Sequence, residues 1–150
     1  MIEHSPHSTV LIAEQVMPTS RYSPAQHRVE PQMILVAGPF RSGTGDDPWR
    51  MEANEAVMTE ISLRLFRAGH LPVMGEWFAF PLIEHAGGGV IGDTIYSEIF
   101  HPVARRLVEK CDAVLRVGGP SEGADDMIVT AWRLGKKTYF ALEDVPGVTS

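Results

Sequence analysis

The stretch Met33-Ile-Leu-Val-Ala-Gly-Pro-Phe-Arg-Ser-Gly-Thr-Gly45 decides the fold. Its first five residues form a continuous apolar run, which is typical of a strand buried on both faces of a parallel sheet. A glycine-rich loop follows over 38–45, and Asp47-Pro48 then gives a helix start, with a capping side chain and a proline where its missing N–H does no harm. The stretch therefore predicts a strand, a loop and a helix in the order found in α/β proteins.

The same alternation continues to the end of the chain. Apolar residues three and four apart predict a helix that ends at Gly69, a second after Asp93 or Thr94, and a third capped by Ser121. We interpret 75–92 as a long irregular connection and expect Pro102 to kink or split the second helix. Strands are predicted near residues 33–38, 70–74, 112–117 and 137–142. Because crossovers between parallel strands are right-handed, this order predicts an α/β, doubly wound parallel sheet of four or five strands.

Composition excludes several classes of protein. A chain of 150 residues has room for one sizeable core. A formal net charge of −6 argues against binding to nucleic acid, which requires a positive surface. We find no apolar run long enough to span a membrane and no signal peptide, so we expect a cytoplasmic protein. The single cysteine, Cys111, excludes an internal disulfide framework.

The first 32 residues differ from the rest of the chain. They are rich in proline, serine and histidine and show no sustained helical or strand period. We interpret 1–32 as an N-terminal arm, poorly ordered or packed on a partner, and 33–150 as the folded domain. His4, His7 and His27 are too scattered to predict a metal site, and we predict neither a metal nor a cofactor.

Two glycine-rich loops predict the position of a ligand. In open parallel sheets, ligands bind beyond the carboxyl ends of the strands, where the loops 38–45 and 118–124 both lie. Each loop brings backbone N–H groups to a helix N-terminus, which attracts anions. Arg41, Ser42 and Ser121 add donors suited to phosphate. The glycines could equally serve only to permit tight turns. Neither loop is a P-loop or a dinucleotide fingerprint.

Aromatic and titratable residues are expected near the same edge. Trp77, Phe78 and Phe80 could stack on a base or sugar, or could simply cover the sheet, and Trp77 is the strongest candidate for a ligand contact. A carboxylate beside a sugar can act as nucleophile or as acid/base, although most such groups are solvated caps. The titratable groups expected at this edge are Glu76, Asp93, Glu98, His101, Asp125 and Asp126.

Four short motifs, in this order, resemble the nucleoside 2-deoxyribosyltransferase-like superfamily, which includes the deoxynucleoside monophosphate N-glycosidases. They are Val36-Ala-Gly-Pro-Phe-Arg41, the helix that ends Arg67-Ala-Gly-His-Leu-Pro72, Cys111-Asp-Ala-Val114, and Pro120-Ser-Glu-Gly-Ala124. The resemblance covers residues 33 to about 143. It implies a flavodoxin-like sheet, a nucleoside or nucleotide ligand, and a homodimer or higher homo-oligomer. In the monophosphate-specific members the two loops hold the phosphate, and this role carries over to Gly38, Arg41, Ser42, Gly43, Ser121 and Gly123.

The sequence departs from this family at the positions that carry its chemistry. In an ungapped alignment the family's nucleophilic glutamate falls at Met127, its aspartate at Ala104 and its strand tyrosine at Leu35. If this register holds, base transfer and hydrolysis are expected to be weak or absent. The carboxylates that could substitute are Asp126, Asp93 and Glu98, with His101 one helical turn from Ala104.

Three functions therefore stay open. The chain could be an enzyme that transfers or hydrolyses an N-glycosidic bond, which is the label we prefer. It could instead be an inactive nucleotide-binding sensor or partner subunit, or an enzyme with another reaction on a phosphorylated ligand, using His101 and Glu76 as acid/base. The predicted catalytic candidates are Asp126, Asp93, Glu98 and His101. The predicted ligand-binding residues are Gly38, Pro39, Phe40, Arg41, Ser42, Gly43, Glu76, Trp77, Gly119, Ser121, Gly123 and Met127.

Overall fold

The computed structural model describes residues 29–88 and 94–149, and its centre is a four-stranded sheet. All pairs are parallel, in the order β2-β1-β3-β4. The central strands are β1 (Met33–Ala37) and β3 (Ala113–Arg116), with β2 (Leu71–Val73) and β4 (Lys137–Tyr139) at the edges. The predicted α/β doubly wound, flavodoxin-like fold is confirmed, with four strands in the described part of the chain.

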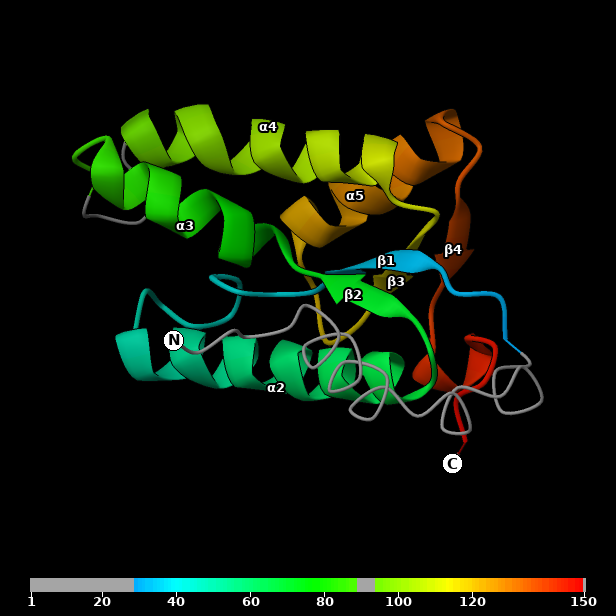
Figure 1. Ribbon diagram of the computed structural model, residues 1–150. Coiled ribbons are helices and arrows are strands. Elements are labelled where there is room, and N and C mark those ends of the chain that lie inside the picture. Colours follow the sequence, from blue (N-terminus) through cyan, green and yellow to red (C-terminus); the bar gives the residue numbers. More distant parts are fainter. Residues whose placement is uncertain (1–28, 89–93, 150) are drawn as a thin grey trace, which may run out of the picture.

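Four helices cover the two faces of this sheet (Figure 1). Helix α2 (Pro48–Arg67) lies on one face together with the C-terminal segment, which includes the short 3-10 helix η3 (Leu142–Asp144). Helices α3 (Gly75–His85), α4 (Thr94–Lys110) and α5 (Glu122–Arg133) lie on the other face. This arrangement brings the start of α5, the start of α3 and the loop before α2 to the carboxyl edge of the sheet.

The alternation of side chains along β1 divides the core into two clusters. Ile34 and Val36 face α2, where they pack with Met58 and Leu65. Leu35 faces α4 and α5 and packs with residues such as Val108 and Ile128. Because both faces of the strand are buried, its sequence is a continuous apolar run rather than an alternating one.

The helix ends follow the predicted caps. The Asp47 side chain accepts a hydrogen bond from the Trp49 N–H at the start of α2, and Ser121 Oγ accepts one from the Ala124 N–H at the start of α5. Gly69 and Gly135 follow the C-caps of these helices with φ values of 104° and 68°, a region that favours glycine.

The prediction of an irregular connection over 75–92 is wrong, because residues 75–85 form helix α3. Glycine and Pro81 at this segment suggested a loop, but Glu76, Ala79 and Ile83 have the three- and four-residue spacing of a helix and are its buried face. This face packs on α4 in a cluster that contains Tyr96. Tertiary packing therefore outweighs the hydrogen bond that Pro81 removes from the helix.

Smaller differences concern α4, β4 and the ends of the chain. Pro102 does not split α4, which runs unbroken over Thr94–Lys110. Strand β4 ends at Tyr139 instead of residue 142, because the chain turns into η3. Residues 1–28 of the predicted arm lie outside the described residues, whereas Gln32 is buried and its backbone N–H donates to His70 Nδ1. None of the helices described is long and apolar enough to cross a membrane.

Candidate functional site

A cavity of about 370 Å³ lies at the carboxyl edge of the sheet, and this size is typical of small-molecule sites. Its walls come from the C-terminal half of β1, the loop after it, and the starts of α3 and α5, with α4 closing one side. The lining residues are Leu35, Val36, Ala37, Gly38, Phe40, Arg41, Ser42, Gly75, Glu76, Tyr96, Phe100, His101, Ala104, Ser121, Glu122, Gly123, Ala124 and Met127. Both predicted loops therefore reach one cavity.

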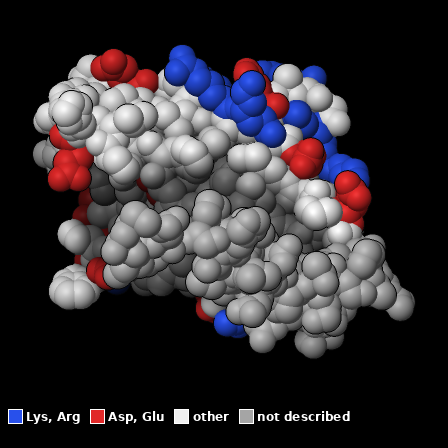
Figure 2. All heavy atoms as spheres, viewed as in Figure 1, with Lys and Arg blue, Asp and Glu red and all other residues white. Residues whose placement is uncertain are grey.

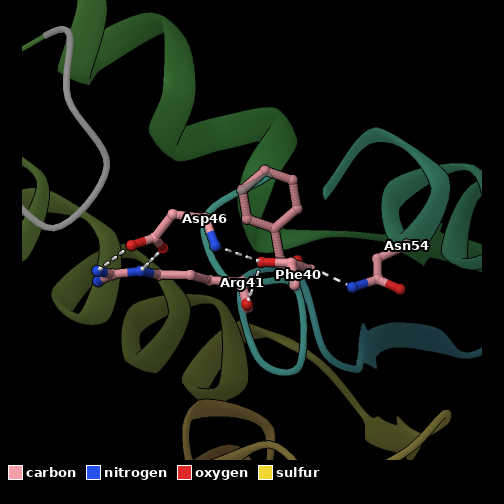
Figure 3. A network of polar contacts seen from close by, with 5 residues as sticks. Phe40, Arg41, Asp46 and Asn54 are labelled. Atoms are coloured by element: carbon pink, nitrogen blue, oxygen red, sulfur yellow. Dashed lines mark hydrogen bonds and ion pairs between the residues drawn. The ribbon is translucent and has the colours of Figure 1, made fainter. Parts of the chain in front are cut away.

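The loop after β1 is fixed by hydrogen bonds at its centre (Figure 3). The buried Thr44 donates through Oγ to the Arg41 carbonyl, and the Asp46 N–H donates to that same hydroxyl at 3.2 Å. Asn54 of α2 donates through Nδ2 to the Phe40 carbonyl at 3.0 Å. These contacts hold the backbone beside the cavity in one conformation, so the side chains it carries are positioned before any ligand arrives.

The loop after β3 is held by Arg116, at the end of that strand. Its Nη2 donates to the Gly119 carbonyl at 2.8 Å, its Nη1 donates to the Val117 carbonyl, and its Nε lies 2.9 Å from Asp125 Oδ1. The side chain is only 11% exposed. Arg116 thus attaches the turn to the first turn of α5. Glu122 and Gly123, the first two residues of this helix, line the cavity, and their N–H groups have no partner within the helix.

The two loops touch each other through their glycines. A Cβ on Gly38 would lie 2.9 Å from the Val117 carbonyl oxygen and from Val117 Cγ2, closer than real Cβ atoms approach. A Cβ on Gly118 would lie 2.7 Å from Pro39 Cδ, and its φ of 76° favours glycine independently. Close approach of the two backbones therefore requires glycine at both positions.

Glu76 is a buried carboxyl group in the wall of the cavity. It lies in the first turn of α3 and is 6% exposed. The pKa of Glu76 is raised to about 7: burial raises it most, a hydrogen bond from the backbone N–H of Glu76 lowers it in part, and the charge of Glu55 adds a smaller rise. A carboxyl group with a pKa near neutrality can both give and take a proton at physiological pH, as an acid/base catalyst requires.

Aromatic rings form the wall between α3, α4 and the first loop. Tyr96 and Phe100 are stacked on successive turns of α4, with ring centroids 5.0 Å apart and planes at 9°. Phe80 contacts both, and Phe40 of the loop lies 5.1 Å from Phe80. Burial raises the pKa of Tyr96 to about 12, and the nearby charge of Glu76 acts in the same direction. The phenol is therefore neutral at physiological pH.

Arg41 stands at the rim of the cavity in an ion pair with Asp46. Its Nε lies 2.7 Å from Asp46 Oδ1, and its Nη2 lies 3.4 Å from Oδ2 (Figure 3). The hydrogen bond and the charge of Asp46 raise the pKa of Arg41, and the same two effects of Arg41 lower the pKa of Asp46. Both side chains are about half exposed, at 48% and 61%.

Most of the residues predicted for the site lie in the lining of this cavity. From the first loop these are Gly38, Phe40, Arg41 and Ser42, and from the other elements Glu76, His101, Ser121, Gly123 and Met127. Pro39, Gly43 and Gly119 instead line a neighbouring cavity of about 420 Å³ that shares Ser42, Ser121 and Glu122 with the first. Leu35 and Ala104 also line the main cavity, beside Met127.

The remaining candidates lie elsewhere. Asp126 forms an ion pair with Arg105 at 3.4 Å and does not line the cavity. Its partner Arg105 belongs to the C-terminal half of α4, a part of the helix over which Figure 2 shows Lys and Arg side chains gathered at the surface. Glu98 is exposed and Trp77 is 41% exposed, both outside the lining. Asp93 lies outside the described residues.

Four further residues of the site were not among the sequence candidates. Tyr96 and Phe100 line the cavity because α4 turns this face toward β1, and their four-residue spacing is the signal that could have identified them. Glu122 borders the cavity at the start of α5. Arg116, which holds the loop after β3, could have been identified as a cation at the carboxyl end of a parallel strand.

In the described ranges, 29–88 and 94–149, no group of three or more histidine, cysteine or acidic side chains could hold a metal ion. Comparison with models of known protein families gives no match. Comparison with curated proteins gives none either.

Proposed function

We propose that the cavity binds a nucleoside or nucleoside monophosphate and that the protein hydrolyses or transfers its N-glycosidic bond. The observation that carries this proposal is Glu76, a buried carboxyl group with a pKa of about 7, facing a cavity of nucleotide size beside two anion-attracting loops. The resemblance of Val36–Arg41 and Pro120–Ala124 to deoxyribosyltransferase-like proteins supports the same ligand class.

The two ends of the cavity suit the two ends of a nucleotide. Ser42, Ser121 and the first N–H groups of α5 offer donors to a phosphate, and Arg41 stands beside them. The stacked Tyr96 and Phe100 offer an apolar aromatic wall to a base. A nucleotide that spans these two ends brings its sugar to the middle of the cavity.

Glu76 has the properties that the reaction needs. In hydrolysis the bond between C1′ and the base nitrogen breaks, a bond from C1′ to the water oxygen forms, and the base leaves with a proton. An ionised Glu76 stabilises the positive charge that develops on the sugar and accepts the proton of the attacking water. His101, also in the lining, is a second group that can donate or accept a proton.

Because Leu35, Ala104 and Met127 are apolar, they cannot carry out the acid/base chemistry, and this role falls to Glu76. They occupy the positions at which the resemblance would place a tyrosine, an aspartate and a glutamate, and all three line the cavity and are buried. They provide no charge, and they help to keep water from the Glu76 carboxyl group. In this proposal Glu76 takes the catalytic role that the sequence predicted for Asp126, Asp93 and Glu98.

The same three residues favour a second function, a nucleotide-binding protein without catalysis. An apolar surface can hold a ligand without reacting with it, and the loops of the cavity would still bind its phosphate. Binding without turnover distinguishes this function from the first.

The experiment measures both binding and base release. A panel of deoxynucleosides, ribonucleosides and their monophosphates is screened by thermal shift, and free base is then measured by chromatography. We expect base release that falls about 10²- to 10⁴-fold in Glu76→Gln. Glu84→Gln is the matched control, because it makes the same change at an exposed position of the same helix.

Two results would contradict the proposal. Turnover that survives Glu76→Gln but is lost in Asp126→Asn would show that Asp126 of α5, and not Glu76, carries out the reaction. Binding with no base release from any compound would establish the second function instead.

A further inference from the structure

The pair formed by Arg41 and Asp46 raises a question of ligand binding. Arg41 is the cationic side chain at the rim of the cavity, yet its Nε and Nη2 are directed at the two carboxylate oxygens of Asp46 (Figure 3). A phosphate that bound the same edge of the guanidinium, through Nε and Nη2, would need those same N–H groups. Asp46 and an anionic ligand therefore compete for one side chain.

The loop is built so that Asp46 stays in reach of Arg41. Asp46 has a φ of 61°, a left-handed conformation that is uncommon for residues other than glycine. The buried Thr44 holds this conformation, since its hydroxyl accepts from the Asp46 N–H and donates to the Arg41 carbonyl. The backbones of the two partners are thus joined through one side chain, while their charged ends stay largely exposed.

We propose that Asp46 is a built-in competitor that sets the affinity of the site for anionic ligands. It holds Arg41 at the rim, and the ligand's anionic group displaces it and takes over the guanidinium. This rests on the proposed function, because it takes that group to be the monophosphate of a nucleotide. An exposed carboxylate is a suitable competitor, since it can turn into water at little cost when displaced.

Doubly charged ligands are the ones that can overcome competition of this kind. A phosphate monoester carries about two negative charges near neutral pH and forms stronger charged hydrogen bonds than a carboxylate does. It can displace Asp46, whereas a neutral nucleoside gains nothing from the exchange. Asp46 thereby lowers the affinity for monophosphates and leaves the affinity for nucleosides unchanged, so it limits how strongly the site prefers a phosphate.

The test is a double-mutant cycle on ligand affinity. Deoxynucleoside monophosphates, the matching nucleosides and inorganic phosphate are titrated by calorimetry into wild type, Asp46→Asn, Arg41→Gln and the double variant. We expect Asp46→Asn to tighten monophosphate binding about two- to fivefold, the range of an exposed ion pair. Arg41→Gln should weaken monophosphate binding and abolish the gain from Asp46→Asn.

Two features of the chain sharpen this test. Asparagine tolerates the left-handed backbone, so Asp46→Asn leaves the loop intact. Asp47→Asn removes the same charge one residue further on, and asparagine caps a helix as well as aspartate does. Because Asp47 pairs with Arg50 and not with Arg41, this control should leave monophosphate affinity unchanged.

A spectroscopic readout does not depend on catalysis. The Nε–H resonance of Arg41 should shift when inorganic phosphate or a monophosphate is added, and should stay in place with a nucleoside. An equal gain from Asp46→Asn with and without Arg41 would overturn the competition and leave a simple charge effect. Base release from a monophosphate that leaves the Nε–H resonance of Arg41 in place would also overturn the competition, although the proposed function would then stand. A phosphate-induced shift with no base release would instead remove the proposed function and keep this inference.

Discussion

The two ends of β2 hold two buried polar side chains with opposite surroundings. His70, just before the strand, is 3% exposed, accepts a hydrogen bond from the Gln32 N–H at Nδ1, and lies 2.7 Å from the Pro146 carbonyl through Nε2. Glu76, just after the strand, is nearly as buried but faces a cavity, and burial raises its pKa to about 7.

The comparison separates a structural polar residue from a functional candidate. The partners of His70 are backbone groups from two distant segments, so its ring joins the entry to β1 and the C-terminal segment to β2. The environment of Glu76 instead disfavours its charge, and such a cost is typical of sites where a perturbed carboxyl group has a task. Burial alone does not distinguish His70 from Glu76, because both side chains are buried. Their surroundings do: His70 contacts backbone groups, whereas Glu76 faces a cavity.

The largest expected effect on stability comes from removing His70, the structural residue before β2. His70→Ala removes both hydrogen bonds and leaves the buried N–H of Gln32 and the part-buried carbonyl of Pro146 without their partner, so the free energy of unfolding should fall by roughly 3 kcal/mol. Urea denaturation followed by circular dichroism measures this change.

His85→Ala is the control for this substitution, because His85 is exposed in the last turn of α3. It should change the free energy of unfolding by less than about 0.5 kcal/mol. An equally small effect of His70→Ala would remove the contrast between the two ends of β2.

An effect of similar size and opposite sign is expected at the other end, from the charge of Glu76. The pKa of Glu76 is 4.5 in an unfolded chain and about 7 in the folded protein. Its contribution to stability is therefore fully present below pH 4.5 and is lost as the pH rises through 7. Glu76→Gln removes the ionisation, so it should stabilise the protein by about 3 kcal/mol at pH 8.

At pH 5 the same substitution should change stability by less than about 1 kcal/mol, because Glu76 is then largely protonated in the folded protein. Urea denaturation at the two pH values checks the difference. A gain in the free energy of unfolding that is the same at both pH values would mean that the shape of the glutamine side chain, and not the lost charge, explains the effect.

The smallest effect concerns the residue after Glu76. Trp77, Phe78 and Leu82 expose 41%, 45% and 54% of their surface on the outer side of α3. We expect the protein to self-associate, as a two-fold dimer, through such aromatic surface. Light scattering should give a mass near twice 16.5 kDa, and Trp77→Ser should shift it toward the monomer. A monomer in the wild type at micromolar concentration would contradict this.

The sequence predicted the sheet well because its strands are short apolar runs between helix caps with clear side-chain chemistry. Asp47, Ser121 and Gly135 all mark real helix ends. It missed α3 because Gly75 and Pro81 are local signals of a loop, whereas the helix is stabilised by packing on α4, a contact between elements that no local pattern encodes.

The candidate site was predicted less completely, for a related reason. Glycine loops at strand ends predicted Arg41, Ser42 and Ser121, because topology alone brings such loops to one edge. Which acidic side chain faces inward depends on the rotation of each helix. Asp126 and Glu76 are both near a helix N-terminus, but α5 directs the first to Arg105 and α3 buries the second.

The contact between the loops at Gly38 and Gly118 has a consequence for how this chain can change over generations. Each glycine is fixed by the backbone or ring of the other segment, so neither can gain a side chain while its partner stays as it is. A variant that enlarges one loop must first make room in the other, some eighty residues away in the sequence. The two segments are therefore expected to vary together, and a protein engineer who wishes to move this site to another sheet must transplant both loops at once.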